Sequence, residues 1–225
     1  MKVNYIPEFL LRNFSDDGET ICAVSKEVGL ARPLLLSSVT CEYETKDKDI
    51  KRIEKVFPAV EEKVRVIINE KVRYSEDLSG EERTILTAFV VLMTLRMPWS
   101  MDKVKEFSEN FVLKESPCTE RLAKMFPLFQ RDIFKCAMEL FTNEGDLVVW
   151  ESKEPFVLSD IPVGFVPLIP NVGLYGDQIY LPVTPYRCLT FLRHSKLPYK
   201  RTPSKYVNLL NQESLNRSMK GVIAV

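Results

Sequence analysis

Asp160 and Arg96 are the two charged residues whose surroundings in the sequence first suggest chemistry. Asp160 follows a short apolar run, Phe156–Leu158, and precedes Pro162, so we expect it in a loop at a strand end, where polar site residues often lie. Arg96 directly follows a strongly apolar helical pattern. A carboxylate in such a loop can bind a metal ion or orient a water molecule, and an arginine can hold an anionic group.

Each of these residues also has an ordinary structural interpretation. A carboxylate in a turn accepts hydrogen bonds from backbone amides two residues further on, and Asp160 could act in this way. An arginine after the last turn of a helix can bond the free carbonyl groups and interact favourably with the helix dipole, as Arg96 could. The sequence leaves both alternatives open at each position.

The C-terminal segment is strongly basic although the whole chain is neutral. From Gln178 to Val225 there is one acidic residue against eight basic residues, so this segment carries a net charge of +7 and the rest of the chain −7. Cations bind backbone phosphates, and unstacked bases can lie on the interleaved aromatic residues, which are Phe191, Tyr199 and Tyr206. We therefore predict a nucleic-acid-binding surface formed by Arg193, Lys196, Lys200, Arg201 and Lys205. The alternatives are neutralisation by acidic helices elsewhere in the chain and an acidic protein partner.

Several common kinds of site are not expected. The five cysteines form no CxxC pair and are accompanied by a single histidine, His194, so a structural zinc site is disfavoured. GxSxG, Walker and Rossmann glycine patterns do not occur. We predict no cofactor, and a divalent metal is an alternative that no ligand pattern supports.

The sequence favours a cytoplasmic protein that does not enter a membrane. Scattered cysteines are typical of buried thiols in a reducing compartment. The first residues lack the apolar core of a signal peptide. The most apolar stretch, Ile85–Met97, has 13 residues, well short of the roughly 20 that span a bilayer.

The elements that must position these residues follow from hydrophobic periodicity. Spacing of three or four predicts helices over 7–14, 49–73, 79–96, 101–112, 119–142 and 204–219, with Pro58 expected to kink or divide the second. Ser79 and Glu82 form a capping-box pattern. Short β-type runs predict strands over 20–24, 147–150, 156–158, 178–181, 188–191 and 221–225.

These elements predict an α+β fold with a helical N-terminal two-thirds and a short-stranded, β-rich C-terminal third. The chain is expected to form a single domain, 1–225. Its helical part would cover about 1–145, and its β-rich part with the basic tail about 146–225.

Four segments, in order, resemble an uncharacterised bacterial family, domain of unknown function 4238. The segment Asn4–Phe14 is similar to its opening HYVPxFxLxxF signature, and Arg96-Met97-Pro98 looks like its RxP segment. Leu158–Val163 resembles its SDNPV motif, with Pro182–Pro185 in the place of its PLSP, and the end of the chain resembles its closing motif through Val207, Asn208, Leu210, Asn211, Val222 and Ile223. The resemblance spans nearly the whole chain and implies a single domain with this α+β architecture. It implies no enzymatic activity.

The chain departs from the family pattern at two positions. The first histidine of the family is Asn4 here, and the asparagine of its Asp-Asn-Pro is Ile161. Asparagine can form hydrogen bonds but cannot exchange a proton near neutral pH. If the family histidine is an acid or base, this member is impaired or uses another group.

Three functions from different classes remain. The first is a hydrolase or transferase acting on a nucleotide or nucleic acid, in which the catalytic residues Asp160, Arg96 and Asn4 lie near one another and Asn4 positions the substrate. The second is a non-catalytic protein that binds nucleic acid through the basic tail. The third is a protein-interaction module of a mobile-element or defence locus, with a protein partner. The sequence does not decide whether the protein is an enzyme.

Overall fold

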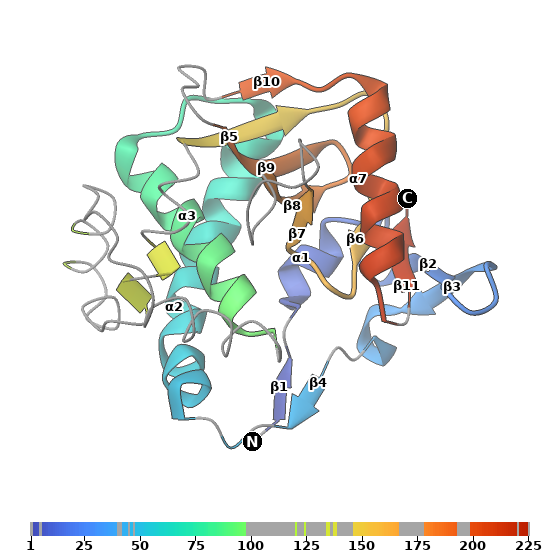
Figure 1. Cartoon of the computed structure of the whole chain (residues 1–225), viewed down its shortest axis with the longest axis horizontal. Helices are drawn as coiled ribbons and strands as arrows, with labels where there is room; N and C mark the ends of the chain where they lie inside the picture. The colour runs from blue at the N-terminus through green and yellow to red at the C-terminus, as the bar shows by residue number, and fades with distance from the viewer. Residues whose placement is uncertain are drawn as a thin grey trace. The chain divides into compact units, whose positions relative to one another are not determined.

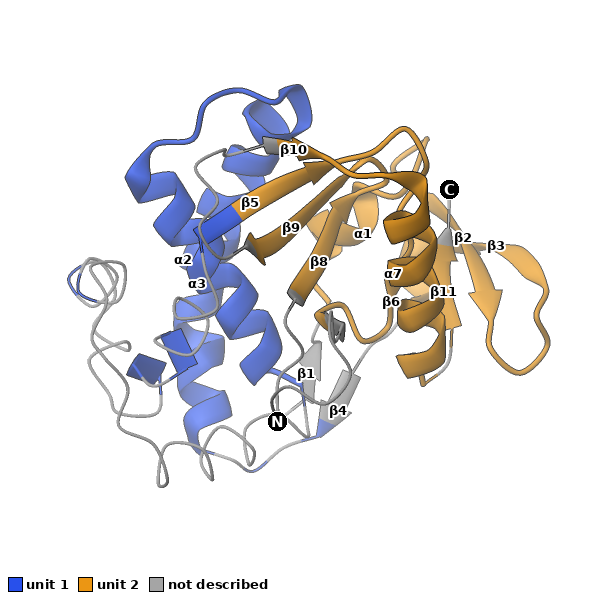
Figure 2. Cartoon of the chain, turned by 45° about the horizontal axis from the view of Figure 1, so that its top comes forward, with its two compact units in different colours: residues 1–5, 42–147 blue, residues 6–41, 148–225 orange. Residues whose placement is uncertain are grey.

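The computed structural model of the chain describes residues 2–4, 6–39, 42–44, 46, 48–97, 120, 124, 134–135, 137–138, 146–166, 178–192, 199–219 and 221–224. The chain forms two compact units, each made from two stretches that are distant in sequence (Figure 2). The first unit comprises residues 1–5 and 42–147, and the second comprises 6–41 and 148–225.

The predicted helix 101–112 and most of the predicted helix 119–142 lie outside the described residues. The single-domain prediction stays a prediction.

Two long helices dominate the described part of the first unit. Helix α2 (Lys48–Glu70) buries the predicted apolar stripe and runs through Pro58 without being divided. Helix α3 (Gly80–Leu95) begins with the predicted capping box, in which the Ser79 side chain and Glu82 bond each other's backbone N–H groups. The rings of Phe57 and Phe89 join the helices, with centroids 5.9 Å apart.

A small sheet and an ion pair complete the described part of this unit. Strand β1 (Lys2–Asn4) pairs antiparallel with β4 (Glu42–Glu44). The turn η2 (Val72–Tyr74) follows α2. The Lys71 ammonium lies 2.7 Å from the Glu82 carboxylate, so the end of α2 is tied to the start of α3.

The second unit contains a sheet in the order β10-β5-β9-β8-β7 (Figure 1). Its strands are β5 (Asp146–Glu151, whose first two residues are assigned to the first unit), β7 (Gly164–Val166), β8 (Gln178–Thr184), β9 (Arg187–Leu192) and β10 (Tyr199–Arg201). Strand β10 pairs parallel with β5 and forms one edge of the sheet. β8 pairs antiparallel with both β7 and β9.

A further sheet of this unit joins the two ends of the chain, in the order β3-β2-β11-β6. Its strands are β2 (Thr20–Ser25), β3 (Ala31–Leu35), β6 (Leu158–Ser159) and β11 (Gly221–Ala224), and it is preceded in sequence by helix α1 (Glu8–Arg12). The turn η1 (Leu36–Ser38) follows β3. Because β11 lies between β2 and β6, the last strand of the chain occupies an interior position in the sheet.

Helix α7 (Ser204–Arg217) packs against strands of both sheets of this unit, contacting β6, β7 and β11 (Figure 1). Its buried positions are Val207, Leu210 and Ser214, which share one helical face. Val207 and Leu210 enter a core cluster with Val148, Trp150, Phe156, Tyr180 and Cys188. Leu215 is 37% exposed because the preceding Ser214 occupies the buried position in this turn of the helix.

The α+β class is confirmed, but the predicted division into a helical N-terminal part and a β-rich C-terminal part is wrong. Strands β1 to β4 lie within the first 44 residues, and α7 lies near the end of the chain. β2 and β3 share a sheet with β6 and β11, so N-terminal and C-terminal segments form one structure. The reason is that β11 completes its hydrogen bonding with strands distant in sequence, and periodicity does not reveal such pairings.

Candidate functional site

Asp160 lies at the end of β6 and connects it to the segment that follows α7. Its carboxylate Oδ1 accepts hydrogen bonds from the Met219 backbone N–H at 3.0 Å and from the Ser159 hydroxyl at 3.3 Å. The side chain is 7% exposed. The predicted bond to the amide two residues on cannot form, because that residue is Pro162. The local turn is closed instead by Ser159, whose hydroxyl accepts the Ile161 N–H at 3.1 Å.

Asp160 also lines a cavity of about 360 Å³ on one face of the sheet β3-β2-β11-β6. Alternate residues of a strand share a face, and the registers place the following side chains on this one: Ile21, Ala23, Ser25, Arg32, Leu34 and Ile223. The lining is therefore mainly apolar, with hydroxyl and charged groups at a few positions. Such a cavity can hold a small molecule and orient it by its polar groups. We refer to it as the sheet cavity.

Arg96 is buried at the end of α3 and binds a carboxylate on α2. Its Nε donates to Glu54 Oε1 at 2.6 Å, and its Nη2 donates to Glu54 Oε2 at 3.1 Å. The guanidinium carbon lies 3.8 Å from the ring centroid of Phe57. The anion that faces Arg96 in these contacts is a side chain of the protein. Sequence reasoning missed Glu54, since only packing shows which carboxylate faces a buried arginine.

The three predicted catalytic residues are divided between the two units. Asn4 ends β1, opposite Glu42, and belongs to the first unit with Arg96, whereas Asp160 belongs to the second. The contacts given above link Arg96 to α2 and Asp160 to the α7–β11 connection. The convergence of the three residues on one catalytic pocket stays a prediction.

Three of the predicted nucleic-acid-binding residues lie in the described part of the chain. Lys200 and Arg201 are on the edge strand β10, and Lys205 is in the first turn of α7. All three are exposed, and within the described ranges no acidic side chain forms an ion pair with any of them. Arg193 and Lys196 lie outside the described residues. Consecutive side chains of a strand point to opposite faces, so Lys200 and Arg201 flank the β10 edge from its two sides. We call this edge, with Lys200, Arg201 and Lys205, the basic surface.

The predicted stacking of bases on aromatic residues of the tail is wrong for Phe191. This side chain is 1% exposed, because it belongs to the buried part of β9. Tyr206 is half-buried and packs against Trp150, with ring centroids 6.2 Å apart. The Lys205 ammonium lies 5.2 Å from the Tyr206 ring centroid. In the described part of the tail, the side chains of the basic surface are therefore exposed to a ligand, whereas the rings of Phe191 and Tyr206 are buried or half-buried.

A second cavity, of about 340 Å³, lies where α7 begins, beside the neighbouring ends of β5, β9 and β10. It is lined by Glu151, Ser152, Lys153, Arg187, Arg201, Thr202, Pro203 and Ser204. Arg187 Nη2 lies 3.5 Å from Glu151 Oε1, and the Thr202 N–H donates to the Glu151 carbonyl at 2.8 Å. We call it the junction cavity. Sequence reasoning counted Arg187 only toward the net charge and did not single out Lys153, because their proximity to Arg201 arises from strand pairing.

Two titratable groups in the core of the second unit are held neutral. Burial raises the pKa of Tyr180 to about 12, although a hydrogen bond with Ser214 opposes this shift. Burial also raises the pKa of the Cys188 thiol well above its usual range. Because a thiolate is the reactive form of cysteine, Cys188 is an inert core residue and not a nucleophile.

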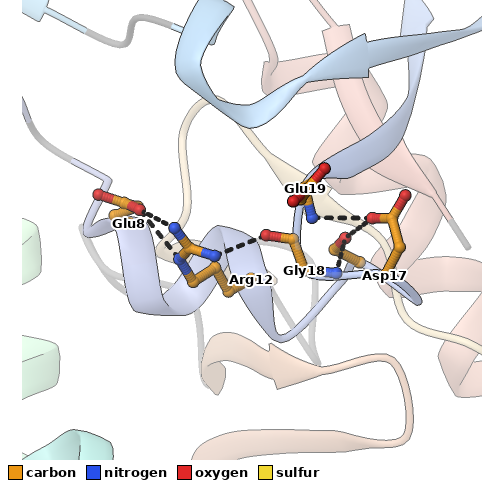
Figure 3. A network of polar contacts seen from close by, with 6 residues as sticks. Glu8, Arg12, Asp17, Gly18 and Glu19 are labelled. Carbon is orange, nitrogen blue, oxygen red and sulfur yellow. Dashed lines mark hydrogen bonds and ion pairs between the residues drawn. The ribbon is translucent and has the colours of Figure 1, made fainter.

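The opening motif contains a polar network with a structural role (Figure 3). Arg12 pairs with Glu8 one helical turn earlier and donates to the Gly18 carbonyl at 2.6 Å. Asp17 accepts bonds from the Thr20 hydroxyl and from the backbone N–H groups of Thr20 and Glu19. These bonds lower the pKa of Asp17 far below its usual range. The network joins α1 to β2.

Metal-ligand clusters and membrane-spanning helices are both absent from the described residues. No three histidine, cysteine, aspartate or glutamate side chains gather there in a way that could hold a metal ion, which leaves the prediction of no cofactor untested. In the same part of the chain, every helix is too short or too polar to cross a membrane.

The sequence also matches a known family model over almost its entire length. Residues 5–225 match the model described as Protein of unknown function (DUF4238), in agreement with the resemblance of the opening, Asp160 and C-terminal motifs. No curated protein and no solved structure matches the chain. The match covers essentially the whole sequence, and the chain therefore belongs to the DUF4238 family.

Proposed function

We propose that this protein binds nucleic acid through the basic surface, by contacts with backbone phosphates. The observation that carries the proposal is that Lys200, Arg201 and Lys205 are all exposed and lack an acidic ion-pair partner among the described residues. Internal neutralisation, the main alternative for a basic tail, would need such partners. A cytoplasmic location is part of this proposal.

The position of these cations favours contact with a phosphate backbone. Lys200 and Arg201 extend from an edge strand, and Lys205 follows them at the start of α7, where the helix dipole adds positive potential. Lys205 is therefore placed unfavourably unless an anion is nearby. Phosphate contacts of this kind read no base sequence, so the binding is expected to be sequence-independent.

The test is the salt dependence of oligonucleotide binding, followed by fluorescence anisotropy. We expect the wild-type protein to bind a labelled single strand with an affinity that falls steeply as salt rises. The double variant Lys200→Ala/Arg201→Ala should bind more weakly and lower the slope of log K against log salt by about 1.4, since each phosphate contact on a single strand contributes about 0.7.

The matched control is Lys51→Ala/Lys55→Ala, which removes the same charge from exposed positions of α2. It should leave both the affinity and the slope close to those of the wild type. Equal losses in the two double variants would mean that only net charge matters. That result, or the absence of salt-dependent binding by the wild type, would refute the proposal.

A second candidate is a hydrolase or transferase acting on a nucleotide or nucleic acid, favoured by the position of Asp160 in the sheet cavity. A buried carboxylate beside an apolar lining is an arrangement that can hold a ligand and orient water. We expect a nucleotide or a divalent metal ion to raise the melting temperature of the wild type but not of Asp160→Asn, which keeps an oxygen acceptor for the Met219 N–H. Equal increases in melting temperature in both proteins would show that Asp160 does not contribute to ligand binding.

A further inference from the structure

We propose that the junction cavity binds a phosphomonoester, supplied in the first place by the terminal phosphate of a nucleic-acid strand. This inference rests on the proposed function, because the same Arg201 side chain belongs to the basic surface and lines the cavity. A strand bound at the basic surface can therefore place a terminal phosphate at the cavity.

The charge of the cavity suits a group with two negative charges. Its lining holds three cations, Lys153, Arg187 and Arg201, against the single carboxylate of Glu151. Glu151 is engaged by Arg187 at 3.5 Å. A phosphomonoester carries about −1.5 to −2 charges at pH 7, whereas a backbone phosphodiester carries one. The net positive charge of the lining therefore favours the monoester.

Hydrogen-bond donors complete the lining. The Thr202 hydroxyl oxygen is buried and has no hydrogen-bond partner among the described residues, which is costly unless a ligand or a water molecule bonds it. Ser204 begins α7, whose first turn holds no acidic side chain, and the preceding Pro203 provides no side-chain cap. The hydroxyl groups of Thr202 and Ser204 and the first amide groups of the helix can then donate to phosphate oxygens.

The size of the cavity allows more than an isolated ion. A volume of about 340 Å³ lies within the range of small-ligand sites, roughly 300 to 1,000 Å³. It can accept a phosphate together with part of the sugar that carries it. The same chemistry is present in a free nucleoside monophosphate, so the test must separate this source from a strand end.

The experiment compares internally labelled oligonucleotides of one sequence that end in a 5′-phosphate, a 3′-phosphate or two hydroxyl groups. We expect one phosphorylated strand to bind about tenfold more tightly than the hydroxyl-terminated strand, the gain of one charge-assisted hydrogen bond. The preference should weaken as the pH falls from about 7.5 to about 5, because the second phosphate pKa is about 6. A free nucleoside monophosphate should compete at the cavity if it is the preferred source.

Two variants change residues of the junction cavity and leave the three residues of the basic surface unchanged. Lys153→Ala removes an exposed cation, and Thr202→Val replaces the hydroxyl group with a methyl group of similar size. Both should abolish the preference for the phosphorylated strand while leaving the affinity for the hydroxyl-terminated strand unchanged. Lys51→Ala, an exposed lysine of α2, is the control and should keep the preference.

The outcomes separate this inference from the proposed function. Equal affinity of the wild type for all three strands would overturn the phosphomonoester site and leave nucleic-acid binding intact. A preference that survives in both cavity variants would also overturn it. If no oligonucleotide binds but a nucleoside monophosphate stabilises the wild type and not Thr202→Val, the proposed function fails and the site stands with a free nucleotide as its ligand.

Discussion

Arg96 is a buried charge that two side chains of α2 contact. Its guanidinium is bonded in a bidentate manner by Glu54 and lies over the ring of Phe57, so both neighbours come from α2. A pair of this kind contributes little when compared with apolar packing, but removal of one partner leaves an uncompensated buried charge. Within the first unit, this contact holds the end of α3 against α2.

We predict that Glu54→Ala destabilises the protein by about 3 kcal/mol, because the buried guanidinium of Arg96 loses its bidentate contact with a carboxylate. The measurement is the free energy of unfolding in urea. Glu62→Ala is the control on the same helix, since Glu62 pairs with Arg65 at the surface and its loss should change little. Similar losses of stability in the two variants would contradict a special role for the Arg96–Glu54 pair.

At the scale of elements, the contact between β8 and α7 is organised around Tyr180. Its hydroxyl group lies 3.3 Å from the Leu210 carbonyl, to which it donates, and 3.1 Å from the Ser214 hydroxyl. Its ring covers Gly164 on β7, where an added Cβ would lie 2.0 Å from the ring. Glycine is required at this position because the ring and the neighbouring backbone approach so closely. The glycine that follows the Asp160 motif therefore supports the packing of α7.

The raised pKa of Tyr180 predicts a loss of stability at alkaline pH. In the unfolded chain the phenol loses its proton near its ordinary pKa of 10.0, whereas in the fold it keeps it up to about 12. The stabilisation is therefore complete below pH 10 and is lost as the pH rises toward 12, by about 3 kcal/mol in total. Urea unfolding at a series of pH values measures this loss.

Tyr180→Phe keeps the ring and removes the titrating group. Its unfolding free energy should fall less between pH 10 and 12 than that of the wild type, with a remaining slope from Cys188, whose pKa is raised in the same direction. Parallel pH profiles for the variant and the wild type would show that Tyr180 does not titrate in this way.

Over the whole chain, strand pairing brings N-terminal and C-terminal segments together in the second unit. β11 lies between β2 and β6, and an added Cβ at Gly221 would lie 2.1 Å from the Val24 carbonyl oxygen. The N-terminal residues 6–41 and the C-terminal residues 148–225 therefore fold as one unit, while residues 42–147 belong to the other. The basic surface and the junction cavity both lie in the second unit.

We predict that truncation after Lys220, which removes β11, unfolds the second unit. β2 and β6 would lose their common partner, and their exposed backbone groups would have no replacement. The measurement is the cooperativity of thermal unfolding together with the near-ultraviolet circular dichroism. Removal of Val225 alone, which leaves β11 whole, is the control. A cooperative transition in the longer truncation would contradict an essential role for this strand.

Elements with strong local signals could be predicted from the amino-acid sequence. The apolar stripes of α2 and α3, the capping box of Ser79 and the strands around Leu189 and Val222 depend on periodicity and on short-range hydrogen bonds. The sequence also showed the concentration of positive charge after Gln178 and the motifs of the family.

Contacts between residues that are distant in sequence became visible only in the folded structure. The Arg96–Glu54 pair, the bond of Asp160 to the Met219 amide, and the position of Lys153 beside Arg187 and Arg201 join segments that no local pattern connects. Strand pairing is likewise not determined by local patterns, since the backbone groups of β11 could form hydrogen bonds with any strand of suitable register. The physical reason is that long-range contacts are selected by the combined packing of the whole chain, whereas periodicity reports only which face of each element is buried.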